Sequence, residues 1–470
     1  MKLYSTNNKA NVVSFKKALL EGLAEDGGLY MPQEVQRMPE EFLAKLAEGK
    51  FGDNGNNPKD APDNAHGKNS VEVFREIAFE VSQVLLKDDI DSESLKKIIW
   101  DAFDFDAPLK TINKNVHALE LFHGPTLAFK DFGARFLSRL TSYFLKQEKA
   151  TSQSLPGQDS VPARKVTVLV ATSGDTGSAV ANGFLNVEGI DVVILYPSGK
   201  VSKIQEQQLT TMGGNITALE IDGVFDDCQR LVKQAFVDKE LTQKFTLTSA
   251  NSINIGRLLG QVFYYFYAYY QLEDKTRPAV ISIPSGNFGN LTAGLIAKKM
   301  GLPAHQFIAS TNANNVFEEY MQTGKFTPRN SVETMSNAMD VGNPSNFARI
   351  MELYENSQQK LAQDVWTKSF SDAETAAAIK EIYTTHDYLM DPHGAVAYLG
   401  LSEYQKQNPA TNGIFLITAH PAKFADKVEP IINTKIQIPE RLAQCLNKQK
   451  HTTKLPPDFK TFKDFLIKTR

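Results

Sequence analysis

Short apolar runs alternate with helical patterns from residue 165 onward, and this alternation constrains the fold more than any other feature of the chain. Several runs, among them KVTVLVA and DVVILYP, are apolar at almost every position, so we expect both faces of their sheet to be covered. The segments between them have helical length and spacing, which is typical of βαβ units. We therefore predict an α/β fold of largely parallel sheets with helices on both faces. The expected strands are residues 165–171, 191–197, 215–221, 245–250, 279–285, 306–310 and 413–419, and the expected helices include 202–212, 225–238 and 291–300.

The first 110 residues lack this rhythm and look mainly helical. The segments FLAKLAEGK, VEVFREIAFEVSQVLL and SESLKKIIWDAF are the clearest helix candidates. Polar stretches at 51–70 and 151–164 are predicted to be surface insertions. The predicted domains are a mainly helical N-terminal domain over 1–110, a large α/β domain over 111–160 and 260–470, and a smaller α/β domain over 161–259.

The charge balance and the cysteines do not indicate a nucleic-acid, membrane or metal-binding protein. The 470 residues include 51 Lys and Arg and 54 Asp and Glu, so the net charge is −3 and any anion site must be local. The two cysteines, Cys228 and Cys445, lie far apart without His or Cys neighbours at ligand spacing, which favours neither a disulfide framework nor a metal site. The first twenty residues lack the apolar core of a signal peptide, and no later apolar run approaches the ~18 residues of a membrane span. We expect a cytoplasmic protein.

The segment HGPTLAFKD at 123–131 places Lys130 at a turn into a helix. An exposed lysine has a pKa of about 10.4 and is protonated at neutral pH. Packing against Phe129 and Leu127 would desolvate the amine and make it nucleophilic, able to form a Schiff base. The alternative is a lysine whose stem lies on apolar surface while its amine reaches solvent.

Two glycine-containing loops follow predicted strands and precede predicted helices. In the PSGNFGN loop, glycines let backbone N–H groups converge on an anion, and the helix that follows favours a phosphate. The TSGDTG loop at 172–177 offers hydroxyls and amides that suit a carboxylate. Each has a structural alternative: a tight turn for the first, and helix capping by Asp175 or Thr176 for the second.

Two further polar segments complete the candidate site. The run NSINIGR, which ends at Arg257, supplies amide, hydroxyl and guanidinium groups suited to a phosphate ester, although an isolated arginine is often only a surface or ion-pair residue. Thr418 ends an apolar strand and could be a ligand or a cap. None of these loops has a Walker or dinucleotide glycine pattern. Because the carboxyl ends of parallel strands share one crevice, we expect all these segments to meet at one site.

The chain closely resembles the threonine synthase family of fold-type II pyridoxal phosphate enzymes. The motifs that carry the resemblance, nearly from end to end, are EDGGLYMP, HGPTLAFKDFGARF, TSGDTGSA, YPSGKVSKIQEQQ, NSINIGRLLGQ, PSGNFGN, DPHGAVA and TAHPAKF. The resemblance implies a tryptophan synthase β-like architecture with bound pyridoxal 5′-phosphate.

By this resemblance each segment has a role. Lys130 would form the Schiff base with the cofactor, and Thr418 would face its pyridine nitrogen. Asp131 and His123 would be supporting or structural residues, and Lys200 a helper at the substrate phosphate. The cofactor phosphate would be held by Gly286, Asn287, Phe288, Gly289 and Asn290. The substrate carboxylate would be held by Thr172, Ser173, Gly174, Asp175 and Thr176, and the substrate phosphate by Ser252, Asn254 and Arg257.

The implied reaction is a carbon–oxygen lyase reaction: γ-elimination of phosphate from O-phospho-L-homoserine, followed by addition of water at Cβ to give L-threonine. We expect a monomer with this small-molecule substrate and no metal. Three alternatives stay open at this point. They are a related phospho-lyase that gives 2-oxobutyrate, a non-catalytic phosphate-binding protein of the same fold, and a metal-dependent phosphatase.

Overall fold

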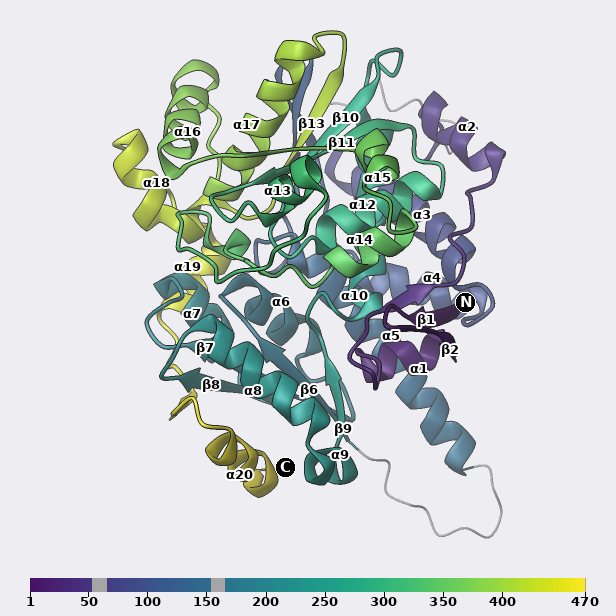
Figure 1. Cartoon of the computed structure of the whole chain (residues 1–470), viewed down its shortest axis with the longest axis vertical. Coiled ribbons are helices and arrows are strands. Elements are labelled where there is room, and N and C mark those ends of the chain that lie inside the picture. Colours follow the sequence, from purple (N-terminus) through teal and green to yellow (C-terminus); the bar gives the residue numbers. More distant parts are fainter. Residues whose placement is uncertain (53–65, 154–164, 470) are drawn as a thin grey trace.

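The computed structural model describes residues 1–52, 66–153 and 165–469, which form three β-sheets surrounded by helices (Figure 1). The two predicted polar insertions lie largely outside the described residues. All seven strands expected from residue 165 onward are present, as are the expected helices. Within the described residues, no helix is long and apolar enough to cross a membrane.

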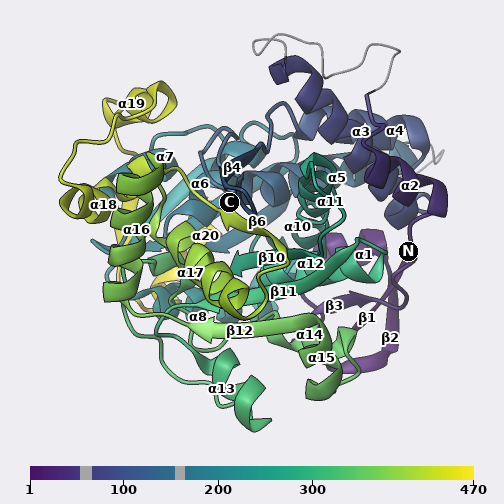
Figure 2. The ribbon, with the colours of Figure 1, turned by 90° about the horizontal axis from the view of Figure 1, so that it is seen from above.

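The largest sheet has six strands in the order β12-β11-β10-β13-β5-β4 and is parallel except for the edge pair β4–β5. Its strands are β4 (Leu109–Asn113), β5 (Val116–Glu120), β10 (Ala279–Pro284), β11 (Ala304–Thr311), β12 (Val365–Ser369) and β13 (Asn412–Ile417). Successive side chains of β13 lie in two different hydrophobic cores. Ile414 and Leu416 lie in the main core, whereas Phe415 and Ile417 pack with α17 (Pro392–Gln407) on the opposite face. Both faces are therefore buried, as the apolar strands predicted. Figure 2 shows β10, β11 and β12 side by side between α12 (Gly289–Lys299) and α17.

The second sheet is entirely parallel, with five strands in the order β14-β8-β7-β6-β9. The strands are β6 (Val166–Ala171), β7 (Ile190–Pro197), β8 (Ile216–Ile221), β9 (Thr246–Ser249) and β14 (Thr452–Leu455). The helices of this region are α6 (Asp175–Phe184), α7 (Lys203–Thr210), α8 (Phe225–Val237) and α9 (Lys239–Lys244).

The C-terminal segment corrects the predicted boundary at 260–470. Strand β14 pairs with β8 of the smaller sheet, and α20 (Phe459–Thr469) buries Phe462 and Leu466 in the core beneath α8. The sequence TTKL of β14 is polar and largely exposed, so it carries no strand pattern of its own. The remaining division into domains stays a prediction.

The N-terminal region contains a sheet that the sequence did not indicate. Strands β1 (Lys2–Ser5), β2 (Asn8–Ser14) and β3 (Tyr30–Pro32) form an antiparallel sheet next to the expected helices. Strand β2 is largely exposed and polar, which explains the missed prediction. The helices of this region are α1 (Phe15–Glu21), α2 (Glu40–Glu48), α3 (His66–Leu86) and α4 (Ser92–Ala102).

Close packing of two helices fixes the positions of the candidate site residues Lys130 and Arg257 relative to each other. Helix α5 (Lys130–Gln153) packs against α10 (Ile255–Leu259), and a Cβ at Gly133 would lie 2.6 Å from the carbonyl oxygen of Arg257. Only glycine permits this approach. The buried α11 (Phe263–Gln271) follows α10. The other helices are α13 (Val316–Thr323), α14 (Phe347–Leu353), α15 (Gln358–Asp364), α16 (Asp372–His386), α18 (Ala425–Ile432) and α19 (Glu440–Leu446), with short 3₁₀ turns η2 (Asn337–Met339) and η3 (Pro421–Phe424).

Candidate active site

One cavity of about 410 Å³ lies where the carboxyl ends of β6, β10 and β13 meet. Thirteen of the fifteen predicted site residues line it, namely Lys130, Thr172, Ser173, Asp175, Thr176, Ser252, Arg257, Gly286, Asn287, Phe288, Gly289, Asn290 and Thr418. Gly174 and Asn254 do not line it. The convergence that strand polarity predicted is therefore observed.

The turn that carries Lys130 is bound to the end of β13. The N–H of Phe129 donates to the carbonyl of Thr418 at 2.8 Å, and the N–H of His420 donates to the carbonyl of Leu127 at 3.0 Å. Leu127 adopts a left-handed conformation with φ 57° to make this turn. The backbone contacts therefore place Lys130 beside Thr418 at the start of α5.

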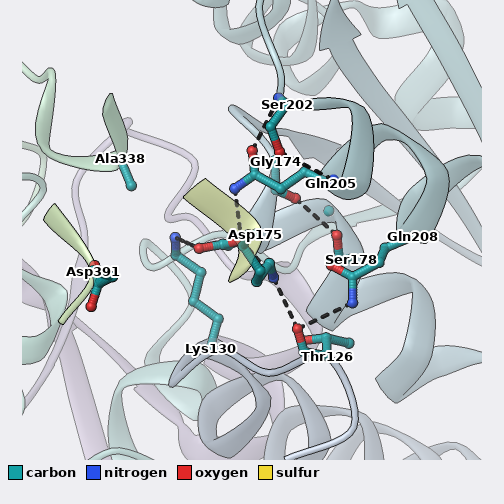
Figure 3. A network of polar contacts seen from close by, with 12 residues as sticks. Thr126, Lys130, Gly174, Asp175, Ser178, Ser202, Gln205, Gln208, Ala338 and Asp391 are labelled. Carbon is teal, nitrogen blue, oxygen red and sulfur yellow. Dashed lines mark hydrogen bonds and ion pairs between the residues drawn. The ribbon is translucent and has the colours of Figure 1, made fainter. Parts of the chain in front are cut away.

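Lys130 is a buried amine that faces a carboxylate. Burial lowers the pKa of Lys130 to about 8, although Asp175, whose Oδ2 lies 3.9 Å from Lys130 Nζ, opposes the shift. Figure 3 shows the amine turned toward Asp175. The unprotonated amine, which is the state required of a nucleophile, is therefore much more populated near neutral pH than in an exposed lysine.

The neighbours of Lys130 in sequence have structural roles. Asp131 is fully buried and accepts hydrogen bonds from the N–H and the hydroxyl of Thr126, at 2.8 and 2.7 Å. Burial raises the pKa of Asp131 to about 6. His123 pairs with Glu120 at 2.8 Å and does not line the cavity. The two residues support the turn from outside the site.

The Asp175 side chain faces two lysines, Lys130 and Lys423, and its predicted contact with a substrate carboxylate stays a prediction. It accepts from Lys423 Nζ at 2.7 Å and from Gln205 Nε2 at 2.8 Å. Burial alone would raise the pKa of Asp175, but Lys423 and Lys130 together hold it well below its usual range. The Asp175 side chain therefore pairs with lysines, and a role for this residue at a substrate carboxylate would have to come from its backbone N–H in the first turn of α6. Lys423 was missed because it lies five residues beyond Thr418, in a segment without strand or helix periodicity.

The rest of the Thr172 loop leaves two hydroxyls for a ligand. Thr172 Oγ1 accepts from the N–H groups of Gly174 and Gly177, at 2.9 and 2.8 Å. Gly174 has φ 135°, and a Cβ there would lie 2.5 Å from the Gln205 side chain. This glycine therefore allows the loop to pack against Gln205 and does not itself contact the cavity. The hydroxyls of Ser173 and Thr176 line the cavity and hydrogen-bond to no other described residue.

The loop between β10 and α12 has the shape of an anion cradle. Phe288 adopts φ 59°, and a Cβ at Gly286 would lie 2.7 Å from Met339 Cα. Asn290 donates through its side chain to the carbonyl of Pro284 at 2.8 Å, which closes the loop on the strand. Gly289 and Asn290, whose N–H groups lie in the first turn of α12 beyond the reach of its carbonyls, line one wall of the cavity.

The predicted segment NSINIGR at 251–257 contains both residues that face the cavity and residues with structural roles. Arg257 lines the cavity, although it is only 3% exposed, and one guanidinium nitrogen donates to the carbonyl of Ala250. Burial lowers the pKa of Arg257 to about 10, so it stays cationic at neutral pH. The prediction that Asn254 binds substrate is wrong because its amide caps α10 and donates to the carbonyls of Leu19 and Ser249. Lys200 lines the mouth, 3.9 Å from Glu333.

His393 also lines the cavity, and sequence reasoning did not single it out. Its Nδ1 donates to Asp391 Oδ1 at 2.6 Å, and its Nε2 accepts from the N–H of Ala338 at 3.2 Å. The DPHG motif, in which Asp391 caps α17, was the available signal. His393 thereby fastens the 337–341 segment against α17.

Comparison with known proteins agrees with this geometry. Family models match residues 105–418 (pyridoxal-phosphate dependent enzyme), 2–55 (threonine synthase N terminus) and 394–466 (threonine synthase, C-terminal). A threonine synthase from Haemophilus influenzae is 41% identical over the full length of both chains. The crystal structure of threonine synthase from Escherichia coli has a TM-score of 0.85 at 38% identity, with both chains fully covered. The structure of pyridoxal phosphate-bound threonine synthase from Brucella melitensis has a TM-score of 0.85 at 32% identity, and covers 99% of this chain and 98% of that one.

These matches run the length of the chain and include the loops that form the cavity. The predicted fold-type II architecture and the predicted pyridoxal phosphate cofactor are confirmed. The chain belongs to the threonine synthase family of pyridoxal phosphate-dependent enzymes.

Proposed function

We propose that this chain converts O-phospho-L-homoserine and water to L-threonine and phosphate, with the cofactor attached to Lys130. Threonine synthase activity follows from family membership; the substrate and the roles of individual residues are the proposal. One observation carries it: a desolvated lysine, a phosphate cradle and a separate buried arginine line one cavity.

The residues present fit pyridoxal phosphate. Lys130 would supply the amine for its aldehyde carbon, and the loop from Gly286 to Asn290 would supply backbone N–H groups for its phosphate. A side chain at Gly286 would collide with Met339, so the cradle depends on this glycine. The hydroxyl of Thr418 is available to the ring nitrogen. When bound, the cofactor withdraws electrons from the substrate and makes its Cα proton acidic.

Lys130 would have a second task, as a base toward the substrate. Its free amine can take the Cα proton, because burial lowers its pKa to about 8 and Asp175 stabilises the ammonium that results. Removal of a proton from Cα and then from Cβ is needed to expel the phosphate from Cγ. The buried position of Lys130 also limits access of bulk water to these steps.

Two polar regions of the cavity can orient the substrate. The hydroxyls of Ser173 and Thr176 suit the α-carboxylate, and Arg257 with Ser252 suits the phosphate. A substrate held at both ends presents its Cα to Lys130. Phosphate leaves by C–O cleavage in this scheme. No group of acidic, His or Cys side chains among the described residues has the arrangement of a metal site that a phosphatase would use.

Product analysis tests the proposal against its nearest alternative. Purified protein given O-phosphohomoserine should release threonine and phosphate in equal amounts. The related phospho-lyase would instead give 2-oxobutyrate and ammonia as the main products. A non-catalytic binding protein would form neither threonine nor 2-oxobutyrate. Either result would refute the proposed function.

We also propose that the enzyme is a cytoplasmic monomer. Both described cysteines, Cys228 and Cys445, are free thiols, which suits a reducing compartment. The large apolar side chains that are well exposed lie singly along the chain, at Val12, Val224, Val237, Val332 and Ile438, which does not suggest an extensive apolar interface.

Cofactor capture should depend on the protonation of Lys130. The amine must lose its proton to attack the aldehyde, so the rate at which the apoprotein binds pyridoxal phosphate should rise with pH to a plateau. The midpoint should lie near pH 8, because burial lowers the pKa of Lys130 to about 8 from 10.5. Stopped-flow absorbance across the pH range measures this rate. A midpoint near that of an exposed lysine would contradict the assigned burial.

Arg257→Ala should weaken substrate binding while cofactor loading stays intact. A charge-assisted hydrogen bond to phosphate contributes roughly 1.5–3 kcal/mol, so KM for O-phosphohomoserine should rise about 10- to 100-fold. Arg257→Lys, which keeps the charge without the planar fork, should fall between the alanine variant and the wild type. Steady-state kinetics and cofactor titration measure the two effects. Equal losses of both would place Arg257 at the cofactor phosphate instead.

A further inference from the structure

The hydroxyl of Ser252 has all its acceptor capacity filled by side-chain amides. Ser252 Oγ accepts from Asn287 Nδ2 at 2.8 Å and from Asn346 Nδ2 at 3.1 Å. A hydroxyl oxygen has two lone pairs and one proton, so two accepted bonds leave only its donor function. Among residues 1–52, 66–153 and 165–469, no group accepts the Ser252 proton. Ser252 lines the cavity, and its proton is therefore available to a ligand there.

The orientation of both amides is determined by groups that can only donate. The N–H of Ser345 donates to Asn287 Oδ1 at 2.6 Å, and Arg349 Nη1 donates to Asn346 Oδ1 at 2.9 Å. Because a backbone N–H and a guanidinium have no acceptor, each amide must place its oxygen there and its NH₂ group on Ser252. Asn346 Nδ2 also donates to the carbonyl of Asn287 at 2.9 Å, which ties it to the glycine loop.

Arg349, which orients the Asn346 amide, is itself held in place by hydrogen bonds to backbone carbonyls. It is fully buried, and its other donors reach the carbonyls of Tyr30, Ser252 and Ile253, at 3.1, 2.9 and 2.6 Å. Burial lowers the pKa of Arg349 to about 9, so it remains protonated, and thus donor-only, at neutral pH. Tyr30 lies in β3, within the EDGGLYMP motif that the proposed mechanism does not otherwise use.

We infer that Arg349 and Asn346 are positioning residues that, with Asn287, make the Ser252 hydroxyl an obligate hydrogen-bond donor to a phosphoryl oxygen in the cavity. The inference rests on the proposed function for the nature of the ligand. A donor-only hydroxyl favours an acceptor-only partner, and an ionised phosphoryl group offers oxygens of that kind. The phosphoryl group can belong to the substrate or to the cofactor, since Ser252 lies beside both Arg257 and the glycine loop.

Asn346→Asp reverses the hydrogen-bond polarity with almost no change in shape. A carboxylate at 346 keeps the contact with Arg349 but accepts the Ser252 proton, which withdraws the donor from the cavity. Ser252→Ala removes the same donor directly. Two titrations separate the possible ligands: pyridoxal phosphate added to the apoprotein, and inorganic phosphate added to the cofactor-loaded protein. Both are equilibrium binding measurements, made by calorimetry.

Asn346→Asp and Ser252→Ala should each raise one of the two dissociation constants about 10-fold or more. The variant that combines them should have a dissociation constant no higher than that of either single variant. Asn343→Asp is the matched control, because it adds the same charge three residues away at an exposed position; it should bind like the wild type. Ser252→Thr, which keeps the hydroxyl, should bind more tightly than Ser252→Ala. Comparing it with Ser252→Ala makes the test independent of whether the Asn346→Asp variant folds.

Unchanged binding of both ligands by Ser252→Ala would overturn the inference. Additive losses in the double variant would also overturn it, because they would show that Asn346 acts by its charge or through the glycine loop. The wild-type protein would still form threonine in either case. These failures are thereby distinct from failure of the proposed function.

Discussion

Replacing Lys130 by alanine should reduce the rate of threonine formation by at least about 10³-fold, the largest effect that we expect from any single substitution. The variant loses the amine that attaches the cofactor and the base that takes the Cα proton. Thr418 and the glycine loop are untouched, so the cofactor should still bind, but without a covalent link. Product assays measure the rate, and borohydride treatment followed by mass spectrometry measures the link.

Lys130→Arg separates nucleophilicity from charge. Arginine keeps a cation near Asp175 but stays protonated and cannot bond to the aldehyde. It should therefore be as inactive as the alanine variant. Thermal unfolding of both variants verifies that they fold. Substantial threonine formation by either variant would remove Lys130 from the centre of the mechanism.

Asp175→Asn should lower the free energy of unfolding by about 3–5 kcal/mol, the effect expected when one partner of a buried ion pair is removed. Lys423 has no exposed side-chain surface and would keep only neutral acceptors, namely the carbonyl of Thr126 at 2.9 Å and the new amide oxygen, so its charge would be buried without a counter-charge. Lys130 would lose its nearest carboxylate as well, so its pKa should fall below its present value of about 8. Urea denaturation of the apoprotein measures the stability.

A double variant tests whether the loss comes from the unpaired lysine. Asp175→Asn combined with Lys423→Met removes both charges and replaces the ammonium by an apolar side chain of similar length. It should recover at least half of the stability lost by Asp175→Asn alone. A single variant of nearly wild-type stability, or a double variant less stable than the single, would contradict the ion pair as the stabilising element.

The regions of the fold that could be predicted from sequence are those whose local pattern matches their burial. Strands β6, β7, β10 and β13 are buried on both faces and apolar at most positions, so their sequences were sufficient. Strands β2 and β14 are exposed and polar, and they exist because a neighbouring strand offers unpaired backbone groups. That information is tertiary and has no local signal.

The candidate site follows the same division. Loops that leave strands at their carboxyl ends converge on one cavity, and strand polarity predicted this. Which polar groups face the cavity depends on partners distant in sequence. Asn254 and Gly174 serve as cap and turn, and Asp175 is neutralised by Lys423, a residue of a distant segment of the chain. Sequence spacing between motifs cannot reveal such pairings.

The central claim is that phosphate leaves this substrate by C–O cleavage and that water then adds to carbon. Running the reaction with O-phosphohomoserine in ¹⁸O-labelled water, with mass spectrometry of both products, tests it most directly. We predict one labelled oxygen in each threonine and none in the phosphate released. Label in the phosphate with homoserine as the other product would show P–O hydrolysis, and would contradict the account.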